Sequence, residues 1–172
     1  LASILHGAFC ALAQTDVKKL VAYSSVSHMG FVMLGLASMT VEGVNGAVMQ
    51  MFNHGTSTAM MFLLIGILYD RSHHRYIVKP DGSRGFSGLA IQMPKFTIIF
   101  MIGMFASIGL PGMAGFVSEF LIFLGSFKAF TLYTVLATIG LFFGAAYLLW
   151  MYKRMFFGEV SAEVKEYSDV SK

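Results

Sequence analysis

Long stretches without charged residues alternate with short polar segments along the 172 residues of this chain. Four of these stretches reach the roughly 20 residues with which a helix crosses a hydrocarbon core of about 30 Å. They cover residues 20–39, 43–69, 96–127 and 129–152, and only the third contains a charge. A shorter apolar stretch at residues 1–13 predicts the end of a further helix. The pattern therefore predicts an all-α, polytopic transmembrane helix bundle.

Residues 96–127 are too long for one straight crossing, because thirty-two helical residues extend for about 48 Å. Gly109, Pro111, Gly112 and Gly115 lie near the middle of this stretch. Proline removes a backbone donor, and glycine lowers the cost of leaving helical geometry. We therefore expect a discontinuous helix, which a bilayer tolerates only where protein or water satisfies the freed backbone groups. Glu119 follows about two turns later, and an ionisable group at this depth is a candidate functional residue.

Composition supports a membrane protein, because 12% of the residues are charged whereas soluble domains have about 25%. The formal net charge of +3 comes from residues between the apolar stretches, so we expect no nucleic-acid partner. Cys10 is the single cysteine and excludes an intrachain disulfide. The sequence has no dinucleotide-binding glycine pattern, no P-loop and no clustered Cys/His spacing. We therefore expect neither a metal nor a cofactor to be bound by this chain itself.

The basic residues predict the orientation of the bundle. If each long stretch crosses once, residues 14–19, residues 71–95 and the end of the chain share one side. That side has eleven of the twelve Lys and Arg residues, namely Lys18, Lys19, Arg71, Arg75, Lys79, Arg84, Lys95, Lys153, Arg154, Lys165 and Lys172. Lys128 alone lies on the other side. The positive-inside rule then places the basic side in the cytoplasm or mitochondrial matrix. We expect one membrane domain at 1–157, a basic loop at 71–95 and a polar tail at 158–172.

Two of the predicted spans contain polar side chains three or four residues apart, which places them on shared helix faces. Each set includes one histidine, His28 or His54, and the supporting polar residues are Ser24, Ser27, Gln50, Asn53, Ser57 and Thr58. Such groups suit a proton relay, because histidine titrates near neutrality and hydroxyls and amides hold water beside it. From spacing alone, simple packing contacts worth about 0.6 kcal/mol each are the favoured explanation for both histidines, and a relay role stays open. For Glu119 the functional interpretation is favoured, because an ionised carboxylate is costly there.

Several motifs resemble the antiporter-like membrane subunits of respiratory complex I, the NADH:quinone oxidoreductase. The chain is most similar to the chain 4 branch of that family, and the resemblance covers nearly all of it. The string Tyr23-Ser24-Ser25-Val26-Ser27-His28-Met29-Gly30 is the most specific of these motifs. The others are Gln50-Met51-Phe52-Asn53-His54-Gly55, Leu68-Tyr69-Asp70-Arg71, Gly109-Leu110-Pro111-Gly112 and Ser118-Glu119-Phe120.

The resemblance implies that this chain corresponds to helices nine to thirteen of a fourteen-helix antiporter-like fold, of which the twelfth is discontinuous. It implies that Glu119 is the ionisable residue of that helix, and that His28 and His54 lie on a central hydrophilic axis. Glu at this position is similar to chain 4, whereas sister subunits usually have Lys. The family's charged pair and central lysine belong to helices that this chain lacks. We therefore expect a fragment or one piece of a split polypeptide, with a partner chain supplying helices one to eight and fourteen.

The function that the resemblance implies is proton translocation in the membrane arm, driven by quinone reduction elsewhere in the complex. NAD, FMN, iron–sulfur clusters and ubiquinone would be bound by other subunits, and the partners would be membrane-arm subunits and lipids. The expected location is the mitochondrial or bacterial inner membrane. Three alternatives remain: a subunit of a Mrp-type cation/proton antiporter, a plastid NDH membrane subunit, and a scaffold without transport activity.

Overall fold

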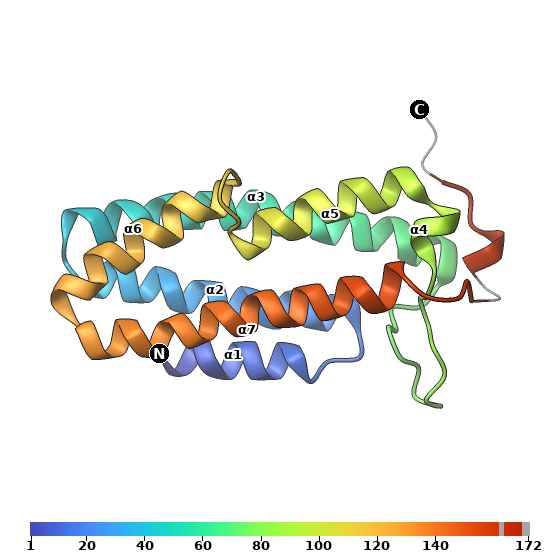
Figure 1. Cartoon of the computed structure of the whole chain (residues 1–172), viewed down its shortest axis with the longest axis horizontal. Helices are drawn as coiled ribbons and strands as arrows, with labels where there is room; N and C mark the ends of the chain where they lie inside the picture. Colours follow the sequence, from blue (N-terminus) through green and yellow to red (C-terminus); the bar gives the residue numbers. More distant parts are fainter. Residues whose placement is uncertain (162–163, 170–172) are drawn as a thin grey trace.

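The computed structural model describes residues 1–161 and 164–169, and helices run along most of that length (Figure 1). Within these described residues, three helices are long and apolar enough to cross a membrane: α2, α3 and α7. In chain order the elements are α1 (Ala2–Leu12), α2 (Val17–Ala37), α3 (Val41–Ser72), α4 (Leu89–Gln92), α5 (Pro94–Ile108), α6 (Ala114–Ala129), α7 (Thr131–Phe156) and a short 3-10 helix, η1 (Val164–Glu166). The predicted all-α bundle with one discontinuous helix is confirmed.

Local sequence explains where the helices begin. The Asp16 carboxylate accepts hydrogen bonds from the backbone N–H groups of Lys18 and Lys19, at 2.8 and 3.1 Å, and so caps the start of α2. The Thr40 hydroxyl accepts from the N–H of Gly43 at 3.1 Å and caps α3 in the same way. Pro94 occupies the first position of α5, where a backbone donor is not needed.

The segment expected to be a loop at residues 71–95 contains more structure than the polar pattern indicated. The helix α3 continues to Ser72, α4 forms within the segment, and α5 already begins at Pro94. Antiparallel bridges join Asp16 to Tyr76 and Val78 to Arg84, and they fold this segment against the end of the bundle. The predicted tail includes residues 162–163 and 170–172, which lie outside the described residues.

The helices run along one common direction, and the discontinuous span lies beside α3 for its whole length (Figure 1). The helices α5 and α6 follow each other end to end, with the break near the middle of the bundle. On the other side of the bundle α2 packs against α1, and α7 runs alongside α1. The break therefore lies beside α3, far from both ends of the molecule.

Two apolar clusters fill the bundle on either side of that break. The larger cluster lies toward the end with α4 and includes the rings of Phe100, Tyr152 and Phe156. The Phe156 ring stacks on that of Tyr152 with centroids 4.5 Å apart and lies tilted to that of Phe100 at 4.9 Å. The smaller cluster lies toward the opposite end and consists of Ile4, Phe31, Ile122 and Ala137. Along α2, Ser24 and His28 come between residues of the first cluster and Phe31 of the second. A polar layer thus separates two apolar regions.

Candidate functional site

The candidate site is organised around the break between α5 and α6. Gly109 ends α5 in the left-handed conformation, with φ of 76°, which glycine adopts at little cost. A turn follows in which the N–H of Met113 donates to the Leu110 carbonyl at 2.9 Å, and α6 begins at Ala114. Gly115 lets the two helix ends approach closely, because a Cβ there would lie 2.8 Å from the Ala106 carbonyl oxygen. The break occurs where the glycines and Pro111 predicted it.

Glu119 lies one and a half turns into α6, and its side chain points into the bundle, where only 5% of the residue is exposed. Its Oε1 accepts a hydrogen bond from the Gln50 amide at 3.4 Å. Its Oε2 lies against Gly109, in a space that a Cβ at that position would fill. The carboxyl group is therefore held between an intact helix on one side and the backbone of the break on the other.

His28 is the ionisable group beside Glu119, with Nε2 3.9 Å from the carboxyl Oε1. Its Nδ1 lies 2.9 Å from the Ser24 carbonyl oxygen, and its Nε2 lies 3.1 Å from the Ser107 carbonyl oxygen. Ser107 is in the last turn of α5, where carbonyl groups have no partner within the helix. The break thus supplies a backbone acceptor to a histidine on another helix.

The surroundings of His28 suit both of its charge states. Carbonyl oxygens only accept, so both carbonyl contacts become hydrogen bonds together only when the ring has two N–H groups. In the neutral ring Nδ1 can instead accept from the Ser24 hydroxyl, 3.3 Å away. That hydroxyl is also 2.7 Å from the hydroxyl of Tyr147 on α7. Rotation of two hydroxyl groups can therefore accompany a change of charge on His28, without movement of a helix.

His54 continues the polar layer away from Glu119. Its ring centroid is 5.1 Å from that of His28, and the Thr58 hydroxyl lies 3.2 Å from its Nε2. Two small cavities, each of about 10 Å³, adjoin the two imidazoles. This volume is near the smallest that accommodates one water, and the lining of each cavity includes polar groups beside the imidazoles. A single water in either cavity could join the two rings by hydrogen bonds.

Side chains of α3 hold α6 in place beside the break. The Asn53 amide donates to the Ala114 carbonyl at 2.6 Å and to the Ser118 hydroxyl at 3.2 Å. The Ser118 hydroxyl in turn donates to the Gln50 side-chain oxygen at 2.5 Å. Gln50 therefore connects Ser118 with Glu119, and its own orientation is fixed by the partners on either side.

The predicted polar residues do not all reach this layer. Ser27 instead donates to the Ile4 carbonyl at 3.0 Å and ties α2 to α1, so the structure does not bring it to the cluster. Ser57 lines the cavity beside His28 and His54, although its hydroxyl bonds within its own helix. Within residues 1–161 and 164–169, no group of three or more His, Cys, Asp or Glu side chains is placed to hold a metal ion.

Three groups at the site were missed from the sequence: the Tyr147 hydroxyl, the Ser118 hydroxyl and the Ser107 carbonyl. A tyrosine within a long apolar stretch is a usable signal, because a buried phenol hydroxyl requires a partner. Ser118 adjoins Glu119 and falls on the same side as Gly115 at helical spacing. No sequence signal identifies the Ser107 carbonyl, because its role depends on where the end of α5 meets α2.

Comparison with known proteins places this chain in a family. The family model described as NADH:quinone oxidoreductase/Mrp antiporter, TM, matches residues 1–144. The NADH-quinone oxidoreductase subunit M of Rickettsia conorii is 42% identical over 171 residues, which cover 99% of this chain and 34% of that protein. The chain therefore spans about a third of the length of that curated relative.

Solved structures agree in fold. A chain of respiratory complex I from Thermus thermophilus with bound NADH is 36% identical, with a TM-score of 0.90 over 98% of this chain and 34% of that chain. A chain of the Mrp complex from Dietzia sp. has a TM-score of 0.84 at 23% identity and covers 93% of this chain, which supports the fold alone. The chain belongs to the NADH:quinone oxidoreductase/Mrp antiporter transmembrane family.

Proposed function

We propose that this chain is part of an NADH-quinone oxidoreductase membrane subunit of the subunit M or chain 4 type. In this part of the subunit, Glu119 takes up and releases protons. The observation that carries the proposal is the position of Glu119: buried, at a helix break and 3.9 Å from His28. An ionisable group in a transmembrane bundle that faces the interior and has such a neighbour typically marks a proton or ion pathway. The chain would act within a multi-subunit membrane complex.

The proposed transfer runs along the polar layer. A proton reaches His54, passes through a water to His28, and gives an imidazolium there. The Nε2–H of that imidazolium then transfers its proton to the Glu119 carboxylate, which leaves a neutral imidazole and a carboxylic acid. A small shift of His28 away from Ser107 would shorten the 3.9 Å separation to hydrogen-bond distance. Gln50 keeps the carboxyl group oriented throughout.

The direct test replaces Glu119 with Gln, which keeps the shape of the side chain and removes its titration. In the complete complex reconstituted into liposomes, we expect pumping-coupled turnover to fall by roughly tenfold or more, since acid–base groups typically contribute factors of about 10²–10⁴. Assembly on a native gel should be unchanged. The matched control is Glu42→Gln, a carboxylate at the far end of the bundle that pairs with Lys128. Normal pumping by the Glu119 variant would refute the proposal.

The second candidate is a subunit of a Mrp-type cation/proton antiporter. It is considered because the fold is similar to that of a chain of the Mrp complex. The higher identity to the complex I chain favours the first candidate. Purification of the intact assembly separates the two. Co-purification of a flavin- and iron–sulfur-containing arm supports the oxidoreductase, whereas sodium/proton exchange without such an arm supports the antiporter. A plastid NDH membrane arm would instead co-purify with a ferredoxin-dependent arm.

The remaining expectations belong to the same proposal. NAD, FMN, iron–sulfur clusters and ubiquinone would be bound by other subunits. A further stretch of polypeptide would supply the helices that correspond to one to eight and fourteen in the family. The end of the bundle with α4 would face the cytoplasm of a bacterium or the matrix of a mitochondrion, in agreement with its basic residues. Protease or thiol labelling of sealed membranes at residues 79–84 tests this orientation.

A further inference from the structure

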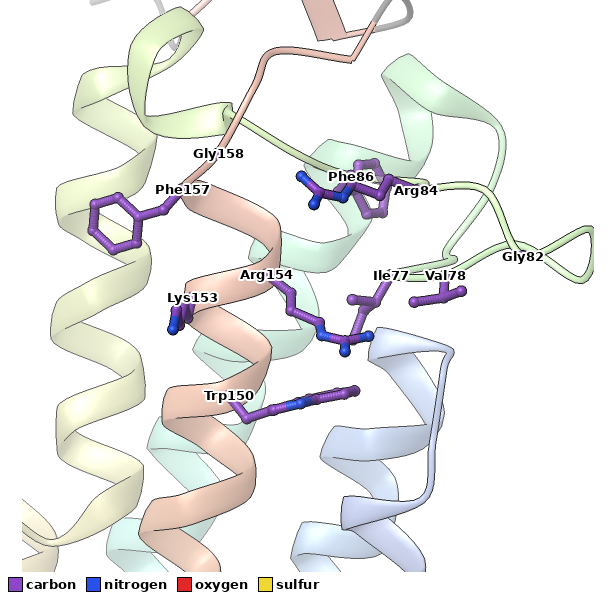
Figure 2. A pocket seen from close by; sticks show the side chains of 10 residues that line it. All are labelled: Ile77, Val78, Gly82, Arg84, Phe86, Trp150, Lys153, Arg154, Phe157 and Gly158. Carbon is purple, nitrogen blue, oxygen red and sulfur yellow. The ribbon is translucent and has the colours of Figure 1, made fainter.

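A cavity of about 570 Å³ lies at the basic end of the bundle, between the last turns of α7 and the segment that joins α3 to α4 (Figure 2). Its apolar walls include Ile77, Phe86 and Trp150, and the lining also includes three basic residues: Arg84, Lys153 and Arg154. No acidic residue lines this cavity. It lies at the opposite end of α7 from Lys128 and takes no part in the polar layer around Glu119.

The two guanidinium groups come from different elements toward the same space. Figure 2 shows the Arg154 side chain extending from α7 over the Trp150 indole, and its Cζ is 4.4 Å from a ring centroid there. The Arg84 side chain reaches back from the loop toward α7. Among the described residues, no carboxylate forms an ion pair with Arg84, Lys153 or Arg154. Two guanidinium groups thus bring positive charge to the lining of one cavity.

The acidic residues near this cavity form no ion pair with its basic residues in the described part of the chain. Asp81 precedes Gly82, which lines the cavity, but its carboxylate accepts hydrogen bonds from the hydroxyl and the N–H of Ser83, at 2.7 and 2.9 Å. These bonds lower the pKa of Asp81 below its ordinary value. Glu159 lines an adjoining cavity of about 440 Å³ and makes no ion pair with Arg84 among the described residues.

A buried hydroxyl provides an independent indication of a polar ligand. The adjoining cavity shares Arg84 and Gly158 with the first and is also lined by Ser87. Ser87 is only 1% exposed, yet its hydroxyl has no hydrogen-bond partner in the described part of the chain. Buried polar groups normally have partners, so a donor that lacks one, beside a guanidinium, favours an external acceptor. A phosphate oxygen is an acceptor that suits both groups.

The sequence places the cavity at the edge of the membrane. Trp150 lies near the end of the uncharged stretch of α7, and Lys153 and Arg154 follow it directly. Trp side chains gather at the level of the lipid headgroups, and basic pockets between transmembrane helices on the cytoplasmic or matrix side suit anionic headgroups. The apolar walls match acyl chains, whereas the guanidinium groups match a phosphate.

We propose that this cavity binds an anionic phospholipid, with the phosphate beside Arg84 and the Ser87 hydroxyl, Arg154 adding positive charge to the lining, and the upper part of an acyl chain against Trp150, Ile77 and Phe86. This inference depends on the membrane location of the chain and not on the proton-transfer role of Glu119. A bound lipid would join α7 to the segment between α3 and α4, two parts of the chain held together here mainly by apolar contacts. The lipid would therefore act as a structural ligand of the basic end.

The test compares two charge-matched double variants of the complete membrane complex. Arg84→Gln/Arg154→Gln removes both guanidinium groups of the cavity. Lys19→Gln/Lys95→Gln removes two exposed cations of the same end, neither of which lines a cavity described above. Each complex is washed in detergent, and the phospholipids that remain are counted by mass spectrometry. Its melting temperature is then measured in nanodiscs of phosphatidylcholine alone or with phosphatidylglycerol.

We expect the cavity variant to retain fewer anionic lipids than wild type and to bind them roughly 30-fold more weakly, given about 1 kcal/mol for each cation removed. It should lose at least half of the increase in melting temperature that phosphatidylglycerol gives, while the control variant keeps that increase.

Equal lipid retention and an equal increase in melting temperature in both variants would overturn the proposal. Inorganic phosphate reproducing the stabilisation in phosphatidylcholine would show a soluble anion as the ligand. Loss of a neighbouring subunit from the cavity variant in both nanodisc compositions would show that the cavity is part of a protein interface. Either result also overturns the lipid assignment.

Discussion

The intact helix α3 and the interrupted pair α5–α6 lie side by side, yet they contribute to the polar layer by different means. The helix α3 satisfies its own backbone, so it can offer polar groups only through side chains such as Gln50, Asn53 and His54. The interrupted pair offers its backbone as well: the Ser107 carbonyl accepts from His28, and Gly109 leaves space for Glu119. The two spans therefore form complementary halves of one site.

This difference indicates what each span can tolerate. Side chains on α3 can be replaced one at a time, with the loss of one or two hydrogen bonds for each. The backbone of the break has no such independence, because one change at Gly109 alters helix termination, the position of the carboxyl group and the close approach of α6 together. We therefore expect a substitution at Gly109 to have a larger effect than substitutions on α3.

The largest effect is expected for Gly109→Ala. The substitution places a Cβ on a residue with φ of 76° and directs it at the Glu119 carboxylate. The left-handed conformation alone costs about 1–2 kcal/mol for a residue with a Cβ, and displacement of the carboxyl group adds to that cost. We expect a lower melting temperature of the complex and loss of most pumping, measured by differential scanning fluorimetry and in liposomes.

Gly112→Ala is the matched control for this prediction. Gly112 has φ of 91°, but a Cβ there would meet nothing within 4 Å. This variant should therefore show only the conformational cost, about 1–2 kcal/mol, and keep its pumping activity. Equal loss of pumping in the two glycine variants would mean that strain, and not contact with Glu119, explains the result.

A smaller effect is expected for Asn53→Ala on α3. The variant loses the hydrogen bonds to the Ala114 carbonyl and the Ser118 hydroxyl, which join α3 to the start of α6. Interhelical hydrogen bonds in membranes contribute about 0.6–2 kcal/mol, so we expect a loss of stability of about 1–2 kcal/mol in thermal unfolding. Thr56→Ala, which removes only bonds within α3, is the control. A loss no greater than that of the control would contradict the idea that α3 side chains hold α6.

Tyr147→Phe should change function more than stability. The variant keeps the buried ring and removes the hydroxyl that lies 2.7 Å from the Ser24 hydroxyl. If hydroxyl rotation accompanies the charging of His28, its loss should slow pumping roughly fivefold, the factor that corresponds to about 1 kcal/mol. Tyr133→Phe, at an exposed tyrosine of the same helix, is the control. Unchanged pumping in the Tyr147 variant would exclude the hydroxyl from the pathway.

The break and the inward direction of Glu119 were accessible from the sequence, because length, glycine content and the cost of a buried charge all act locally. The residues of α3 at positions 50, 53 and 54 were accessible from helical spacing for the same reason. Contacts between distant segments were not accessible. Ser27 has the spacing of a site residue, but α1 takes its hydroxyl because Gly7 and Gly30 let α1 and α2 lie close together.

The basic segment between α3 and α4 shows a second limit of sequence pattern. Its polar residues predict an irregular, solvated loop, and many of them are indeed exposed. Ile77 and Phe86 are nevertheless fully buried, because two backbone bridges turn the segment back against the ends of α2 and α7. Isolated apolar residues in a polar stretch indicate such anchoring only after the partner surface is known.

The smallest effect is expected at the end of the bundle opposite the basic cavity. There the Lys128 ammonium group, in the last turn of α6, donates to the Glu42 carboxylate in the first turn of α3 at 2.6 Å. Both side chains are at least one-third exposed, so water and salt screen their attraction. Lys128→Ala should therefore leave the melting temperature of the complex within error of wild type, at low and at high ionic strength. A loss as large as that of Asn53→Ala would mean that the ends of α3 and α6, and not the polar layer between them, hold the two spans together.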